Sequence, residues 1–264
     1  MATRSAASRP GALRLPWSLT DCSLKAVIGT EMAPSSCGEP EAAVFRAPWG
    51  VRHYGRVTAC GEDVRDALVR QWQAIAAALP AVDLDVPSRV DGWRNREVVA
   101  HLCLQLVVLR RFVATASMQH AMVSLAANLA GTHSLAEFID ASAREAAELG
   151  RVGFAEALND ALPSLRAAGL CLTVVTMQGP IRLVDYLVTR CVEAVVHGGD
   201  LVEPVNPDGV AQAITARALL EVLSHRAPHL VQEARELPLP IWIDIATGRR
   251  PGSGSLAPAV PVMT

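Results

Sequence analysis

Residues 190–200, Arg-Cys-Val-Glu-Ala-Val-Val-His-Gly-Gly-Asp, have the pattern of the last turns of an apolar helix with three polar side chains on one face. Glu193 and His197 are four residues apart, so they stack on adjacent turns, and Asp200 follows on the same face. A carboxylate and an imidazole buried in such a helix need partners, because burying either alone is costly. A metal ion is one such partner, since Zn²⁺ binds imidazole and carboxylate and keeps an open position in catalytic sites. Glu193 and His197 are therefore candidate metal ligands, and a third must come from elsewhere.

The best candidate for the third ligand is His101, which lies between Ala100 and Leu102 in an apolar helix. The alternative is a core histidine whose ring is satisfied by an ordinary hydrogen bond, and periodicity alone favours that reading. Glu97, four residues earlier, is able to pair with His101, but we favour a simpler role for it as a first-turn acid that complements the helix dipole.

The composition excludes several classes of partner. The net charge of −2 gives no reason to expect binding to nucleic acid or to an anionic membrane. The first twenty residues lack the continuous apolar core of a signal peptide, and the most apolar helix, residues 98–113, is interrupted by polar residues. The six cysteines form no CxxC pair, which favours reduced thiols in a cytoplasmic protein. Lys25 is the only lysine among the 24 basic residues, which, with the abundance of Ala, Val, Leu and Gly, suggests a GC-rich and bacterial genome.

Residues 1–57 differ from the rest of the chain, because Pro, Gly, Ser, Ala and Arg are scattered there without period. We expect a disordered N-terminal tail. Translation starting downstream, for instance at Met32, and a transit peptide in the basic first twenty residues are the two alternatives.

Apolar residues recur at helical spacing over residues 62–79, with Val64, Leu68, Trp72 and Ile75 in the stripe. The same criterion predicts helices over residues 95–117, 134–149, 154–170, 181–202 and 207–227. Ser134, with Glu137 three residues later, has the pattern of a capping box. Residues 171–177 are short, apolar and β-branched, which is typical of a strand or an extended link. The sequence thus predicts an all-α bundle over residues 58–230.

The C-terminal segment, residues 231–264, has a different pattern. Residues 241–245, Ile-Trp-Ile-Asp-Ile, alternate like a strand, and Thr247-Gly248-Arg249-Arg250 reads as a turn. Small residues then run to Thr264 without pattern. We expect a short extended appendage with a flexible tail.

Two segments together resemble a known family. Residues 91–102, Asp-Gly-Trp-Arg-Asn-Arg-Glu-Val-Val-Ala-His-Leu, are similar to the GW-x-x-x-D/E-x-x-x-H-L stretch of the mycothiol-dependent maleylpyruvate isomerase family, a branch of the DinB/YfiT-like four-helix bundles. Residues 193–200 are similar to its E-x-x-x-H-x-x-D stretch. Their order, their separation and the preceding amphipathic helix also match, so the resemblance covers residues 62–205.

The resemblance implies a DinB-like four-helix bundle with a divalent metal, usually zinc, bound by His101, Glu193 and His197. It assigns Asp200 a supporting role, orienting an imidazole or anchoring the loop after the helix. We expect Trp93 to fill the core at the helix entrance. Two departures stand out. Arg94 replaces the usual Ser or Thr cap, so Asn95 is expected to cap instead, and the 36 residues after Pro228 are too few for the second domain of fuller members.

The resemblance implies a metal-dependent enzyme that activates a low-molecular-weight thiol, mycothiol, for isomerisation or for transfer to an electrophile. Its partners would be that thiol, an electrophilic small molecule and, in some bundles of this kind, a second copy of the chain. The alternative is a metal-binding bundle with a structural or sensing role and no catalysis. Metal-independent hydrolysis has little support, because the sequence lacks a G-x-S-x-G elbow.

Overall fold

The computed structural model describes residues 61–263. The predicted disordered tail, residues 1–57, lies outside the described residues. Among the helices of residues 61–263, none has the length and apolarity needed to cross a membrane.

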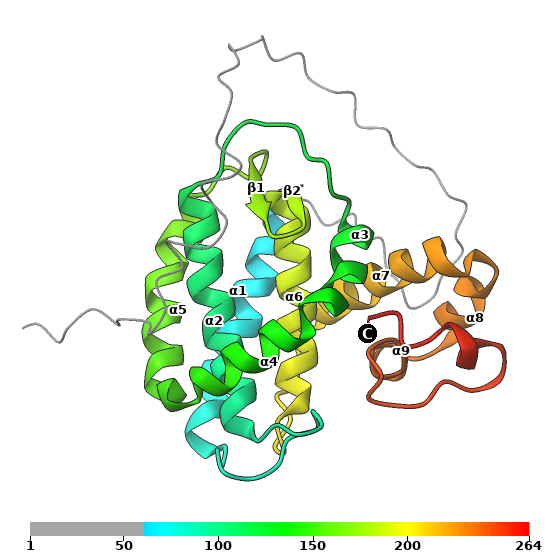
Figure 1. Cartoon of the computed structure of the whole chain (residues 1–264), viewed down its shortest axis with the longest axis horizontal. Coiled ribbons are helices and arrows are strands. Elements are labelled where there is room, and N and C mark those ends of the chain that lie inside the picture. Colours follow the sequence, from blue (N-terminus) through cyan, green and yellow to red (C-terminus); the bar gives the residue numbers. More distant parts are fainter. Residues whose placement is uncertain (1–60, 264) are drawn as a thin grey trace, which may run out of the picture. The chain divides into compact units, whose positions relative to one another are not determined.

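Four helices form the bundle, and each contacts two others (Figure 1). Helix α2 packs against α5 and α6, and α1 packs against the same two helices, so α1 and α2 occupy opposite corners. Their bounds are Gly61–Ala78 for α1, Asn95–Ala114 for α2, Gly150–Ala167 for α5 and Leu183–Asp200 for α6. The prediction of an all-α bundle is confirmed, and the helical patterns in the sequence lie on the buried faces.

The apolar stripe of α1 faces the centre of this bundle. Leu68, Trp72 and Ile75 are all at most 1% exposed. Helix α1 ends at Ala78, and a 3₁₀ turn, Leu79–Ala81, carries Pro80 at the predicted stop. Burial of these side chains, worth roughly 1.5–3 kcal/mol for each large apolar residue, holds α1 against α5 and α6.

Helix α2 begins as expected at Asn95, but its N-terminal contacts differ from the prediction. The Glu97 carboxylate accepts the Arg94 backbone N–H at 2.8 Å. The Asn95 amide instead donates to the Asp83 carbonyl at 2.7 Å and accepts the Val202 N–H at 3.3 Å. Asn95 is therefore not the cap, because its side chain ties the connector before α2 to the chain after α6.

A β-hairpin precedes α6. Strand β1, Thr173–Thr176, pairs antiparallel with β2, Gly179–Arg182, with Val174 opposite Ile181. Gly179 has φ of +120°, a conformation that side chains rarely allow, so glycine suits this turn. Of the two alternatives predicted for residues 171–177, a strand or an extended link, the structure has the strand, and α6 begins directly after β2.

The connection between α2 and α5 contains short helices that cover one side of the bundle. They are α3, Leu125–Ala130, a 3₁₀ helix at Gly131–Leu135, α4, Ala136–Glu145, and a 3₁₀ turn at Ala147–Leu149. The predicted capping box at Ser134 is wrong. Ser134 lies inside the 3₁₀ helix, and its hydroxyl donates to the Gly131 carbonyl at 2.8 Å.

Helix α7, Gly209–Arg226, packs on α6 and α1, and it lies where the sequence predicted a helix. A 3₁₀ turn, Pro228–Leu230, follows it.

The C-terminal segment is helical where the sequence predicted a strand. It begins with α8, Val231–Glu236. Helix α9, Leu239–Ala246, contains the alternating run and packs on α7, where the Trp242 indole donates to the Ala216 carbonyl at 3.0 Å. Pro240 in the first turn favours a helix start, and a short apolar run does not by itself distinguish a buried helix from a strand. After α9 a 3₁₀ helix, Gly254–Ala259, follows, and Val262 beyond it is buried.

Candidate metal centre

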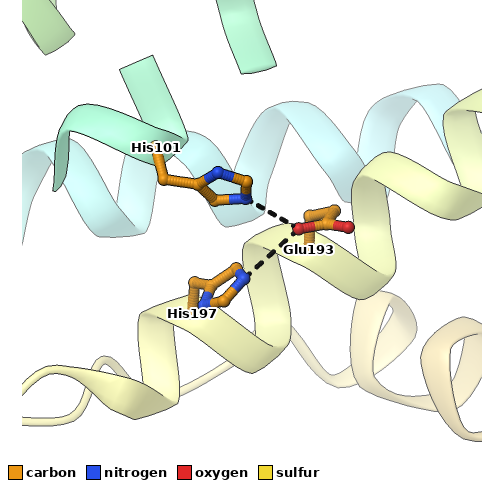
Figure 2. Close-up of side chains that lie close together, drawn as sticks. All are labelled: His101, Glu193 and His197. Atoms are coloured by element: carbon orange, nitrogen blue, oxygen red, sulfur yellow. Dashed lines mark hydrogen bonds and ion pairs between the residues drawn. The ribbon is translucent and has the colours of Figure 1, made fainter. Parts of the chain in front are cut away.

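Three side chains from α2 and α6 meet in the bundle interior (Figure 2). The His101 Nε2 atom lies 2.9 Å from the Glu193 Oε2 atom, and the His197 Nε2 atom lies 3.3 Å from the same oxygen. The two imidazole rings are 4.7 Å apart between centroids and meet edge to face. His101, Glu193 and His197, the three predicted ligands, therefore surround one point.

Local geometry explains this meeting. Glu193 and His197 are one turn apart on α6, so both project from the same face toward α2. His101 lies near the start of α2, which packs against α6. His101 is 4% exposed and Glu193 is 8% exposed, so packed apolar neighbours rather than water surround most of the group.

His197 is held by a chain of ionic hydrogen bonds. Its Nδ1 atom lies 2.8 Å from the Asp200 carboxylate. Arg249 donates to both oxygens of that carboxylate, from Nε at 3.0 Å and from Nη2 at 2.6 Å. The remaining Nη1 atom of Arg249 donates to the Thr247 carbonyl at 2.7 Å. Asp200 therefore fixes the His197 ring so that its Nε2 atom faces Glu193 and His101.

The two histidines have opposite pKa shifts. Burial lowers the pKa of His101, although its hydrogen bond to Glu193 opposes the shift. Burial also acts to lower the pKa of His197, but the hydrogen bonds to Asp200 and Glu193 outweigh it and raise the value to about 9. Burial acts to raise the pKa of Glu193, yet its hydrogen bonds with both imidazoles hold it well below the ordinary value. Without a metal, Glu193 is therefore a carboxylate and His197 an imidazolium at neutral pH.

A cavity of about 260 Å³ adjoins the three side chains. Trp93 forms part of its wall, with ring centroids 5.7 Å from His101 and 6.3 Å from His197. The other lining residues come from the connector before α2, the α3–α4 region, α6 and the C-terminal segment: Val90, Thr132, His133, Ala136, Ile139, Val192, Val196, Thr247, Arg249 and Met263. A small molecule beside the group would thus meet a largely apolar wall with few polar atoms.

The donor set fits a divalent metal. Two imidazole nitrogens and one carboxylate oxygen form a ligand set of catalytic zinc sites, which keep a fourth position for water or substrate. The three candidate ligand atoms lie within 4.8 Å of one another, and metal–ligand bonds of about 2.0–2.1 Å place tetrahedral ligands about 3.3 Å apart. Asp200 on the far nitrogen of His197 is the usual carboxylate–histidine support of such a centre.

Sequence reasoning missed or undervalued several of the surrounding residues. Trp93 is buried, as expected for a core residue, but it also lines the cavity. Gln105 lies one turn after His101, and its amide nitrogen is 3.1 Å from the His101 Nε2 atom. The sequence predicts only a turn at Arg249, and no local pattern signals its pairing with Asp200. Glu97 is not one of the three grouped side chains, and its carboxylate instead accepts the Arg94 backbone N–H at the start of α2.

The thiols of Cys103, Cys171 and Cys191 are poorly placed to react at the cavity. Burial is the main reason that the pKa of Cys103 rises to about 12, and burial also raises the pKa of Cys191. Cys171 is exposed, but it precedes β1 and is not among the residues that line the cavity. Within residues 61–263 these three cysteines form no disulfide. Among the described residues, therefore, no cysteine supplies a reactive thiol at the cavity.

The chain is similar to a solved structure and to a protein-family model. The crystal structure of the mycothiol-dependent maleylpyruvate isomerase is similar with a TM-score of 0.46 and 16% sequence identity, over 62% of this chain and 70% of that chain. No curated protein matches. The model of the mycothiol maleylpyruvate isomerase N-terminal domain matches residues 65–202, from α1 past the end of α6. Since that match spans more than half of the sequence, the chain belongs to the mycothiol maleylpyruvate isomerase N-terminal domain family.

Proposed function

We propose that this protein is a metal-dependent enzyme that activates a low-molecular-weight thiol for isomerisation of an electrophilic small molecule or for transfer to it. His101, Glu193 and His197 would hold the metal, for which zinc is the first expectation. The observation that carries the proposal is the convergence of three ligand atoms on one buried point beside a cavity. Mycothiol is the thiol we expect, because it appears in the name of the family whose model matches.

A divalent metal in such a site lowers the pKa of a thiol or water in its open position, so a nucleophile is available at neutral pH. Glu193 supplies the negative charge that would offset part of the metal charge. Asp200 and Arg249 keep the His197 ring oriented. Trp93 and the apolar wall exclude water from the side on which the small molecule would bind.

The first test is the metal content of the full chain after purification, measured by elemental analysis. We expect about one zinc or other divalent ion for each chain, and loss of that ion in His101→Ala and in Glu193→Ala while the helical circular dichroism persists. His225→Ala and Glu236→Ala, which change the same residue types on α7 and α8, serve as matched controls. A chain that takes up neither zinc, cobalt nor nickel would overturn the proposal.

A second test distinguishes an enzyme from a protein in which the metal is only structural. Chelation should remove the metal and the thiol-transfer activity while the chain stays folded, because the apolar core of the four helices does not depend on the site. Unfolding on chelation, together with the absence of thiol-dependent change in the spectrum of the cobalt form, would instead assign the metal a structural role.

A further inference from the structure

Part of the cavity wall comes from the stretch of chain that follows α9. Met263 lines the same cavity as His101, Glu193 and His197, although it lies far from them in the sequence. Its side chain is half-buried and packs against the hydrophobic core. A long apolar side chain therefore stands beside the space in which a small molecule would approach the candidate metal ligands.

Hydrogen bonds to the backbone hold Met263 in this position. The N–H groups of Val262 and Met263 both donate to the Ala246 carbonyl at the end of α9, at 2.8 and 3.4 Å. The Nη1 atom of Arg226, the last residue of α7, donates to the carbonyls of Pro261 and Val262 at 3.1 and 3.0 Å. Residues 261–263 are thus tied to the ends of two helices.

Two buried side chains anchor the stretch that carries Met263. Leu256, in the 3₁₀ helix at Gly254–Ala259, is 2% exposed, and Val262 is 1% exposed. Both belong to the hydrophobic core, so removing them from water favours the docked position of this stretch. Residues 256–263, which we call the strap, are therefore held by an apolar anchor near each end.

The strap has a fixed place relative to the candidate metal ligands. Met263 is bonded to Ala246, and Arg249, three residues beyond Ala246, donates to both oxygens of the Asp200 carboxylate. That carboxylate in turn lies 2.8 Å from the His197 Nδ1 atom. One short run of contacts thus connects the strap with a predicted ligand, and the position of Met263 at the cavity is a property of the fold.

The cavity is small, so one side chain determines much of its shape. Ligand pockets have volumes of about 300–1,000 Å³, and this cavity has about 260 Å³. Trp93 in the wall is fixed by the hydrogen bond of its indole N–H to Asp140. Methionine is unbranched and flexible, and it fills irregular gaps. Truncating Met263 to alanine would remove the whole side chain beyond Cβ and leave room for a larger ligand.

We propose that Met263, held by the strap, limits the size of the group that can lie beside the reacting sulfur, and so selects small molecules by size. The inference rests on the proposed function and adds a specificity-determining residue to it. A difference of one methylene group in an apolar pocket changes selectivity about 10–200-fold. The volume of a methionine side chain is therefore sufficient for this role.

The test uses the full chain loaded with Co²⁺, whose spectrum reports thiol binding without any turnover. The affinity for phenylmethanethiol, which is bulky, is divided by that for 2-mercaptoethanol, which is small. We expect Met263→Ala to raise this ratio about tenfold without changing Co²⁺ affinity. Met263→Leu, of similar volume, should keep the ratio. Met122→Ala is the matched control, because that methionine is 82% exposed and is not part of the cavity wall.

A second variant tests the strap. Arg226→Ala removes the hydrogen bonds to the carbonyls of residues 261 and 262 without altering the cavity wall, and it should raise the ratio in the same direction. A ratio that Met263→Ala leaves unchanged, or that Met122→Ala raises equally, would overturn the inference and leave the proposed function standing. An effect of Met263→Ala alone would overturn the part assigned to the strap. If the unmodified chain binds no Co²⁺ or neither thiol, the proposed function fails, and the inference fails with it.

Discussion

The two histidines of the candidate centre are held in different ways. His101, on α2, is enclosed by packed residues and contacts Glu193 and Gln105. His197, on α6, is held by Asp200, which Arg249 from the C-terminal segment binds in turn. Burial lowers the pKa of His101, whereas the hydrogen bonds of His197 overcome burial and raise its pKa to about 9. The His101 half of the site is therefore ready for a metal at neutral pH, whereas the His197 half must first release a proton.

Glu193 joins the two halves, so its replacement should have the largest effect. In Glu193→Gln, the charged ligand oxygen shared by both imidazoles is lost, although the side chain keeps its size. Losing a supporting residue around a metal typically costs 10–100-fold in affinity, so losing a ligand should cost more than about a hundredfold. Isothermal titration with zinc would measure this, with Glu236→Gln on α8 as the control. An unchanged affinity would remove Glu193 from the ligand set.

The opposite pKa shifts predict how metal affinity depends on pH. Below about pH 9 the free protein carries a proton on His197, and metal binding must displace it. His101 has a lowered pKa and is already neutral at pH 7, so it adds no second proton. Affinity should therefore rise about tenfold with each pH unit between pH 6 and 8, about a hundredfold in all, and level off above pH 9.

Calorimetry in buffers of different ionisation enthalpy would count the released protons directly. Release of one proton at pH 7 agrees with the difference between the two histidines. Release of two protons, or of none, would show that the two imidazoles are in the same state before the metal binds.

Asp200→Asn tests the support of the His197 half alone. The variant weakens the hydrogen bond to His197 and leaves Arg249 without its acidic partner. We expect metal affinity to fall about 10–100-fold. The free energy of unfolding should fall by about 3 kcal/mol, because Asp200 is fully buried and breaking a buried pair leaves a charge unmatched.

Denaturant unfolding of the metal-free chain measures the change in the free energy of unfolding. Asp244→Asn is the matched control, since that carboxylate also pairs with an arginine, Arg89, but both side chains are considerably exposed, at 30% and 42%. Its loss should cost less than about 1 kcal/mol. Equal losses in the two variants would mean that the Asp200–Arg249 pair behaves as an ordinary surface ion pair.

The sequence was most informative where the relevant contacts are local. The spacing of Glu193 and His197 is a property of one helix, so it was enough to place both on one face. The assignment of His101 as a ligand needed the resemblance to a family, because the contact of His101 with Glu193 depends on how α2 and α6 pack. The apolar stripes likewise predicted the bundle.

The C-terminal segment shows what local pattern could not supply. The alternation over residues 241–245 fits a strand and a buried helix equally well, and the contact of Trp242 with α7 decides for the helix. Arg249 reaches Asp200 only because α9 ends beside the site, with the Arg249 N–H bonded to the Asp244 carbonyl at 2.8 Å. Support for His197 thus comes from the turn predicted at Arg249, and this turn follows a segment that the sequence predicted as a strand and the structure shows as helix α9.

Trp93 contacts the imidazoles of both His101 and His197. Its replacement should therefore change what each histidine contributes to metal affinity equally, and by less than Glu193→Gln or Asp200→Asn. In Trp93→Phe, an aromatic face remains beside the histidines. The hydrogen bond that the indole N–H donates to the Asp140 carboxylate at 2.7 Å is lost. We expect the free energy of unfolding to fall by about 1–2 kcal/mol, as for one hydrogen bond to a charged group. Metal affinity should change by less than about threefold, since a change this small is well below the 10–100-fold effect of losing a direct support.

The dependence of affinity on pH provides the sharper readout for this variant. If Trp93 serves both halves alike, one proton should still be released at pH 7 in Trp93→Phe. Asp140→Asn removes the acceptor of the same bond without changing the aromatic ring, so its stability loss should not add to that of Trp93→Phe in the double variant. A change in the number of released protons would instead show that the indole acts on one histidine more than on the other, and the two halves would then differ in their aromatic contact as well as in their hydrogen bonds.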